Sequence, residues 1–159
     1  MSKPSKQPIS VLVVIHNEHA EVLLLERKDK PGFWQSVTGS KEGQEALLDT
    51  AKREVMEETG INTCQYVPHD WQQQNVYEIY EHWRHRYPAG VTENTEHVFS
   101  LCVPKDITIT LAPQEHLRHQ WLTIEAAAEL VFSPSNREAI LMLKHKGQHD
   151  TTTHYDCNV

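Results

Sequence analysis

The sequence predicts a single domain of the mixed α/β class. Segments rich in β-branched and aromatic residues alternate along the chain with two or three helical segments, which is the pattern of a sheet covered by helices. The 159 residues contain no internal repeat and no linker, and this length suits one domain. Apolar residues make up 38% and charged residues 23% of the chain, which excludes a disordered or collagen-like protein.

The first half of the chain predicts three strands and a helix. Residues 9–15 are β-branched and nearly continuous, which is typical of a buried strand, and residues 22–26 follow after a short polar turn, as in a hairpin. Residues 33–38 form a short strand candidate. Residues 46–59 predict a helix, and Gly60 occupies the position just past its end, where a positive φ is common.

The second half predicts three strands followed by two helices. The strand candidates are residues 75–80, 96–103 and 120–123. A charged segment with Pro and Gly, residues 84–94, separates the first two as a loop. The helix candidates are residues 125–130 and a last helix that starts at a capping box, Ser135 to Glu138, and continues to Leu143. We expect the domain to span residues 6–146, with flexible tails at 1–5 and 147–159.

The charge and hydropathy of the chain restrict its partners. The formal net charge is −7 and the pI about 5.8, which does not favour a nucleic-acid-binding protein. The longest apolar run, residues 11–15, is far shorter than the ~20 residues that a membrane helix needs. The polar first residues carry no secretory signal. We therefore expect a cytoplasmic protein with a small-molecule substrate, and the sequence leaves its oligomeric state open.

An acidic cluster lies near the end of the predicted helix 46–59. Leu48, Ala51 and Val55 share one helical face, with Leu47 beside them, and form the expected buried stripe. Two carboxylates stand on the shoulder of this stripe and a third stands about one step further round, so that all three lie within an arc of roughly 100°. These carboxylates belong to Glu54, Glu57 and Glu58.

This cluster is unfavourable for a helix that is only structural. Glu57 and Glu58 lie in the last turn, where the negative end of the helix dipole costs roughly 0.3–1 kcal/mol for each anion. Glu54 and Glu58 repel each other at the i, i+4 spacing. A divalent cation would reverse each effect, and Mg²⁺ characteristically takes one or two carboxylates together with waters and substrate phosphates. A solvated acidic face remains the alternative from the cluster alone. Arg53 can pair with Glu57 four residues on.

The segment resembles the signature of a known family. The pattern G-x5-E-x7-R-E-U-x-E-E-x-G-U, in which U is apolar, is that of the Nudix hydrolases. The matching residues are Gly39, Glu45, Arg53, Glu54, Val55, Glu57, Glu58, Gly60 and Ile61. The resemblance implies an α/β/α sandwich with a mixed sheet and a loop–helix–loop site. It also implies Mg²⁺, for which Mn²⁺ may substitute, and the hydrolysis of a phosphoanhydride. Glu45 would support the site through water or a second metal.

The flanking segments resemble a bacterial branch of this family that acts on dihydroneopterin triphosphate. The segments are residues 33–40, 84–87, 90–96, 115–117 and 135–137, and the resemblance spans roughly residues 6–143. It implies the metal ligands Glu54, Glu58 and Glu115. It also implies substrate contacts from Lys6, Arg27, Thr38, Tyr77, Glu78, Ile79, Tyr80 and Ser133. For the reaction itself we favour Glu57 as the base over Glu115, with Arg53 orienting it.

The residues expected to meet the pterin ring raise a geometric question. Tyrosines offer faces for stacking on a flat ring, and Glu78 offers acceptors for its amino and amide groups. On an alternating strand, however, Tyr77 and Ile79 face one side while Glu78 and Tyr80 face the other. Some contacts would therefore have to come from the backbone. The alternative is that Tyr77 and Ile79 are core residues.

The expected reaction is the Mg²⁺-dependent release of pyrophosphate from dihydroneopterin triphosphate, a step of folate biosynthesis that leaves the monophosphate. One alternative is a hydrolase of the same family that acts on dATP or on oxidised nucleotides. Another is a module that binds a nucleotide without cleaving it, although degenerate boxes in such proteins lack the glutamates that are present here.

Overall fold

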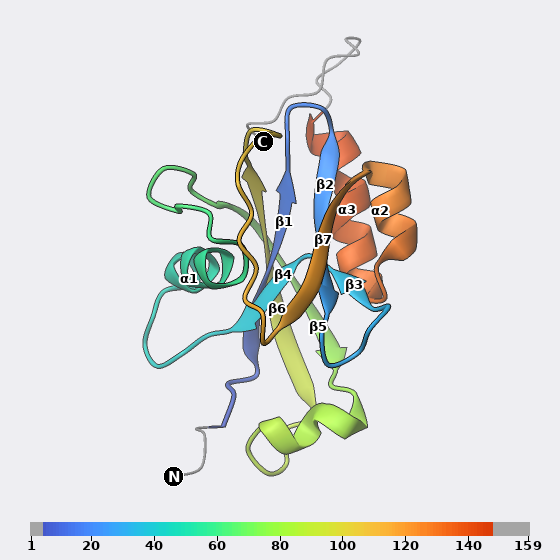
Figure 1. The fold of residues 1–159 in the computed structure, drawn as a ribbon. Coiled ribbons are helices and arrows are strands. Elements are labelled where there is room, and N and C mark those ends of the chain that lie inside the picture. Colours follow the sequence, from blue (N-terminus) through green and yellow to red (C-terminus); the bar gives the residue numbers. More distant parts are fainter. Residues whose placement is uncertain (1–4, 148–159) are drawn as a thin grey trace.

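The computed structural model describes residues 5–147, in which seven strands form one mixed sheet (Figure 1). The strand order is β3-β2-β1-β6-β5, while β4 pairs with β1 and β7 pairs with β2. The pairing of β1 with β6 is parallel and the others are antiparallel. The strands are β1 (Ile9–His16), β2 (Glu21–Arg27), β3 (Trp34–Gln35), β4 (Val37–Ser40), β5 (His69–Glu78), β6 (Glu93–Cys102) and β7 (His116–Thr123).

Helices cover both faces of the sheet, so that the predicted α/β class and the sandwich architecture are confirmed. In Figure 1, α1 (Leu47–Thr59) lies on one side of the sheet, and α2 (Ile124–Leu130) and α3 (Pro134–Gly147) lie on the other. A 3₁₀ helix, η1 (Glu81–Arg86), lies at the lower end of the domain. None of the helices within residues 5–147 has the length and hydropathy that a membrane crossing requires.

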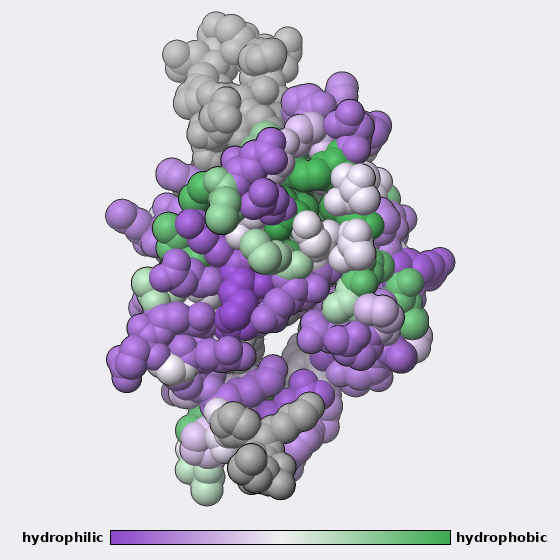
Figure 2. All heavy atoms as spheres, turned by 60° about the vertical axis from the view of Figure 1, so that its left-hand side comes forward, coloured by the Kyte–Doolittle hydropathy of each residue, from purple (hydrophilic) through white to green (hydrophobic). Residues whose placement is uncertain are grey.

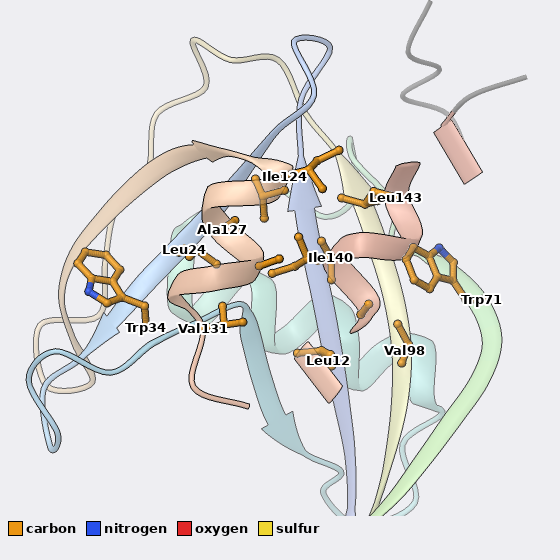
Figure 3. Packing of buried hydrophobic residues seen from close by; sticks show 14 residues of the cluster. Leu12, Leu24, Trp34, Trp71, Val98, Ile124, Ala127, Val131, Ile140 and Leu143 are labelled. Carbon is orange, nitrogen blue, oxygen red and sulfur yellow. The ribbon is translucent and has the colours of Figure 1, made fainter. Parts of the chain in front are cut away.

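The core consists of two hydrophobic clusters, one on each face of the sheet. Side chains alternate along β1, so that Leu12 and Val14 face α2 and α3 while Val11 and Val13 face α1. Figure 3 shows the first cluster, where Leu12 and the labelled side chains of the sheet lie against those of α2 and α3. A strand buried on both faces explains the continuous apolar run of residues 9–15.

Helix α1 begins and ends close to where the sequence predicts. Ala46 is its N-cap, and Gly60 ends it with φ of 73°, donating its backbone N–H to the carbonyl of Met56. The predicted stripe is corrected in one respect: Leu48 is exposed, and Leu47 packs against the core instead. Glu58 is buried rather than placed on the shoulder of the stripe.

The middle of the chain differs from the prediction in its strand boundaries. The predicted strand 75–80 overlaps the end of β5, which starts earlier, at His69, and ends at Glu78, and the pairing of β5 with β6 shifts register between Asp70 and Gln74. Such an irregularity hides the period-2 pattern in the sequence. The predicted loop 84–94 is partly helical, since η1 continues to Arg86, and β6 begins at Glu93. The short strand predicted at 120–123 is the end of β7.

The last helix starts earlier than the predicted capping box. Helix α3 begins at Pro134, a favourable first residue, and the backbone N–H of Asn136 donates to Ser133 Oγ at 3.4 Å. Ser133 rather than Ser135 therefore caps the helix. The helix reaches Gly147, the first residue of the predicted tail. The rest of that tail, and residues 1–4 of the other, lie outside the described residues.

Candidate metal and substrate site

Arg53 holds together the loop that precedes α1. Its guanidinium donates to both carboxylate oxygens of Glu45, at 2.7 and 3.2 Å, and to the carbonyl of Ser40 at 2.9 Å. Glu45 also accepts the backbone N–H of Glu42 and the hydroxyl of Thr50, each at 2.9 Å. With these partners Glu45 orders the loop, and the structure therefore gives the box glutamate a supporting position.

The stabilisation that the Arg53–Glu45 pair gives to the loop before α1 should depend on pH. The hydrogen bonds from Arg53 are the main reason why the pKa of Glu45 falls from 4.5 to about 2. The ionised carboxylate therefore adds stability above about pH 4.5, and this contribution is lost as the pH falls towards 2. We expect Glu45→Gln to lower the free energy of unfolding by about 1–2 kcal/mol at pH 7. In urea titrations the loss should shrink at pH 3, and an equal loss at both pH values would contradict this assignment.

Gly39 allows Glu54 to lie directly against β4. A Cβ atom on Gly39 would lie 2.0 Å from the carboxylate carbon of Glu54, closer than any real contact. Arg53 donates to the other side of this carboxylate, with its Nη1 atom 2.6 Å from Glu54 Oε1. Glu54 is therefore fixed between a glycine backbone and a guanidinium, which explains why the box needs glycine at this position.

Glu58 is a buried carboxylate whose charge is not stabilised by hydrogen bonds from the described residues. Its side chain is 1% exposed, and neither carboxylate oxygen has a hydrogen-bond partner within residues 5–147. Burial is the main reason why the pKa of Glu58 lies well above its usual value, and the neighbouring Glu54 and Glu115 raise it further. A buried anion beside other anions is strongly unfavourable unless a cation binds there. This arrangement is therefore suited to a metal ion.

Glu115 and His116 come to this carboxylate from the start of β7. Single ligand atoms of Glu58, Glu115 and His116 lie within 4.8 Å of one another. Burial lowers the pKa of His116 to about 4, so that the imidazole is neutral at pH 7. Its Nδ1 has no partner among the described residues, and its Nε2 lies 3.6 Å from Glu58. A neutral imidazole and two carboxylates form a donor set that fits a divalent cation.

His116 was missed in the sequence prediction, whereas Glu115 was included. The available signal was its place directly after Glu115 and its spacing from His119, but the sequence alone does not show that β7 carries it to Glu58. Glu57 lies further out than these groups. Its side chain is 54% exposed and only 3.5 Å from Arg53 Nη1, so the predicted pairing forms at the limit of a hydrogen bond.

Cationic side chains lie on the same side as the acidic cluster. Arg27 is the register partner of His116 on the adjacent strand. The backbone N–H of Lys28 donates to the carbonyl of Glu115 at 2.9 Å. The guanidinium of Arg27 makes two 2.7 Å contacts with Asp29 and lies 4.8 Å from the ring centre of Trp83. The predicted phosphate-binding Arg27 is therefore in reach of the cluster, but Asp29 holds it in this structure.

The segment before β1 adds a further cation. The backbone N–H of Lys6 donates to the carbonyl of Arg86 at 2.8 Å. Burial lowers the pKa of Lys6, and the nearby Arg86 and Arg27 lower it too, whereas Glu54 and Glu115 oppose them. The Lys6 ammonium is therefore within electrostatic reach of both the cations and the acidic cluster. Figure 2 shows the surface hollowed between the main body of the domain and its lower end, with hydrophilic side chains around much of the hollow.

The four residues predicted to meet the ring differ in their exposure and in their partners. Tyr77 is 39% exposed, and its hydroxyl is 3.1 Å from Asn94 Nδ2, so it is not a core residue. Ile79 is buried, as the core alternative expects, and its backbone groups already bond to Thr92 and Arg84. Glu78 is paired with Arg84, and Tyr80 is exposed at the start of η1.

The two remaining predicted residues lie on the α3 face of the sheet. Thr38 in β4 pairs with Leu12 and so shares the face that α2 and α3 cover. Ser133 caps α3, and its hydroxyl is 3.1 Å from that of Ser135. Among the predicted substrate residues, Lys6 and Arg27 therefore form a cationic group beside the acids, and Thr38, Tyr77 and Ser133 form a neutral group on the α3 face.

An α/β/α sandwich whose loop–helix–loop segment carries a complete acidic box defines a class of protein. Residues 6–143 match the family model described as the NUDIX domain, and the chain belongs to the Nudix hydrolases. The comparison confirms the family that the box predicts.

Individual relatives share most of their length with this chain. The dihydroneopterin triphosphate diphosphatase of Escherichia coli (strain K12) is 47% identical over 141 residues, which cover 87% of this chain and 93% of that protein. The protein of the same name from Haemophilus influenzae is 38% identical, covering 82% and 84%. The solved structure of the E. coli dihydroneopterin triphosphate pyrophosphohydrolase superimposes with a TM-score of 0.84 at 45% identity, covering 91% of this chain and 99% of that one.

Proposed function

We propose that this protein hydrolyses dihydroneopterin triphosphate to dihydroneopterin monophosphate and pyrophosphate in the presence of Mg²⁺. The observation that carries the proposal is the buried carboxylate of Glu58, which has the carboxylates of Glu54 and Glu115 and the cationic Lys6 beside it. The relatives that are 47% and 38% identical to this chain are named for this activity, and they align with it over most of their length. A role in folate biosynthesis follows from that substrate.

The metal would be held by the carboxylates of Glu54, Glu58 and Glu115, and His116 offers one further donor atom. A divalent cation bound at this position would neutralise phosphate charge and make a water molecule more acidic. Carboxylate oxygens favour Mg²⁺, and the imidazole makes Mn²⁺ an effective substitute. The neutral state of His116 suits this role, because a protonated imidazole has no free electron pair for a metal.

Lys6 and Arg27 would bind the oxygens of the triphosphate. Arg27 presents a planar group that can bind phosphate with two hydrogen bonds, and a substrate oxygen would compete with Asp29 for it. Lys6 would reach the same region as a point charge, and the lowered pKa of its ammonium reflects burial first and the surrounding cations second. An anionic chain of phosphates relieves this repulsion, and so the cationic group gives the substrate its orientation.

Glu57 would accept the proton of the attacking water. It is the most exposed of the four box glutamates, and Arg53 lies within 3.5 Å of it. Because Arg53 is bonded more closely to Glu45 and Glu54, it fixes the helix end that carries Glu57. Glu115 is the competing base, and its contact with Glu58 and His116 favours a metal-binding role instead.

The ring of the substrate would lie near Thr38, Tyr77 and Ser133, with Glu78, Ile79 and Tyr80 shaping the edge of the site. Tyr77 and Tyr80 are exposed and aromatic, and so they can stack on a flat ring. The net charge of −7 does not favour a nucleic-acid partner, and we place the enzyme in the cytoplasm.

The test is product analysis with dihydroneopterin triphosphate, dATP and dGTP, each with Mg²⁺ and with EDTA. We expect pyrophosphate and monophosphate in the presence of Mg²⁺ only, with kcat/KM at least tenfold higher for the pterin than for dATP. A higher kcat/KM for dATP would instead indicate a nucleotide-cleaning enzyme. No pyrophosphate from any substrate would indicate a module that only binds nucleotides.

A further inference from the structure

A row of polar side chains crosses the sheet on the face that α3 covers, away from the acidic cluster. Ser10, Glu96 and Asn75 are register partners on β1, β6 and β5. Two residues further along their strands, Leu12 and Val98 belong to the hydrophobic cluster under α2 and α3, as Figure 3 shows. Because side chains alternate along a strand, Ser10 and Glu96 lie on this same face, just beyond the apolar core.

Glu96 is a buried acid with unused hydrogen-bonding capacity. Its side chain is 4% exposed, and its Oε1 atom has no hydrogen-bond partner within the described part of the chain. Ser135 and Asn75 interact with its carboxyl group and lower its pKa, but burial has the larger effect and raises it. Buried carboxylates normally have hydrogen-bond partners for both oxygens. The Oε1 atom of Glu96 could therefore accept a hydrogen bond from a bound ligand.

Asn94 repeats this pattern in the next row of the same face. Its Nδ2 atom donates to Ser10 Oγ at 2.7 Å and to the Tyr77 hydroxyl at 3.1 Å. Its Oδ1 atom has no partner among residues 5–147, although the side chain is buried. The two unpartnered acceptors therefore belong to residues at alternate positions of one strand, and both require N–H or O–H donors.

Partly exposed side chains connect Glu96 and Asn94 to the residues that we place at the substrate ring. Tyr77 bonds to Asn94, and the charge of Glu96 acts on the pKa of Tyr77. Ser135, which interacts with Glu96, is 3.1 Å from Ser133 through their hydroxyl oxygens. Tyr77 and Ser133 are residues that we place at the substrate ring, and so a ligand that meets them approaches Glu96.

We propose that Glu96, assisted by Asn94, recognises the amino-pyrimidinone edge of the substrate ring and so determines specificity, an inference that rests on the proposed function. This edge of a pterin carries a ring N–H next to an exocyclic amino group, and guanine carries the same two donors. A carboxylate offers two acceptors side by side and matches them with paired hydrogen bonds. Adenine presents an unprotonated ring nitrogen there and makes no such pair.

The experiment compares kcat/KM of the full-length wild type and Glu96→Gln for dihydroneopterin triphosphate, dGTP and dATP with Mg²⁺. Loss of the paired hydrogen bonds to a charged group should lower kcat/KM about 10- to 100-fold for the pterin and for dGTP. The value for dATP should change less than threefold. Glu138→Gln, an exposed carboxylate on α3, is the matched control and should leave all three values unchanged.

The two proposals fail in different ways in this experiment. Wild-type protein that prefers dATP over the pterin contradicts the proposed function. The ratio of variant to wild type tests Glu96 separately, since dGTP carries the same ring edge. Equal losses on all three substrates, or no loss on any, would overturn the specificity role. A melting temperature for each variant shows whether an equal loss comes from unfolding.

Discussion

Glu58→Gln should lower kcat by about three orders of magnitude while the protein stays folded. The substitution keeps the shape of the side chain and removes its charge. In the structure this charge is buried, lacks a hydrogen-bond partner within residues 5–147 and lies beside Glu54 and Glu115. Among the described residues no hydrogen-bond donor stabilises this charge, whereas a bound cation would stabilise it. Removing the charge weakens the metal site but relieves repulsion in the metal-free protein.

Activity and stability should consequently change in opposite directions. Without metal, the melting temperature of Glu58→Gln should equal or exceed that of the wild type. Steady-state kinetics in saturating Mg²⁺ measure kcat, and Glu129→Gln, an exposed carboxylate on α2, serves as the control. A near-normal kcat for Glu58→Gln would refute its role as a ligand, and a large loss of stability would show that the charge supports the fold.

Gly39→Ala should lower kcat about 100-fold with the fold retained. The added methyl group would lie 2.0 Å from the carboxylate carbon of Glu54 and 2.2 Å from its Oε2 atom. The side chain of Glu54 must turn away, because β4 is held in the sheet by its pairing with β1. Once displaced, Glu54 would no longer accept a hydrogen bond from Arg53 or reach the metal site.

Gly43→Ala is the matched control for this substitution, in the loop between β4 and α1. A Cβ atom there would meet nothing within 4 Å, although φ of 54° makes the backbone less favourable for alanine. We expect a small loss of stability and unchanged kcat at temperatures where the protein is folded. If Gly39→Ala and Gly43→Ala had the same kcat, the contact between Gly39 and Glu54 would not matter for catalysis.

The box helix could be predicted from the sequence because its determinants are local. The stop at Gly60, the spacing of Glu54 and Glu58 and the partnership with Arg53 all lie within a few turns of one helix. The burial of Glu58 is harder to predict from the sequence. It depends on the strands that pack on α1 and on the approach of β7, which a helical projection of one segment does not contain.

The remaining parts of the site depend on contacts between distant segments. His116 meets Glu58 only because β7 pairs with β2, and Glu96 stays unnoticed in a sequence that has 22 acidic residues. The predicted strand 75–80 covers only the end of β5, because the irregular pairing of β5 hides its first half and the strand ends at Glu78, before η1. As a result, Tyr77 and Ile79 differ in exposure for reasons of local backbone geometry rather than simple alternation.

The central claim is that the carboxylates at the end of α1 hold divalent cations, and Mn²⁺ binding followed by electron paramagnetic resonance tests this claim most directly. The wild type should bind Mn²⁺ without substrate, and Glu58→Gln should bind it at least tenfold more weakly. Mg²⁺ should displace the bound Mn²⁺. Equal Mn²⁺ affinity of the two proteins would contradict the claim.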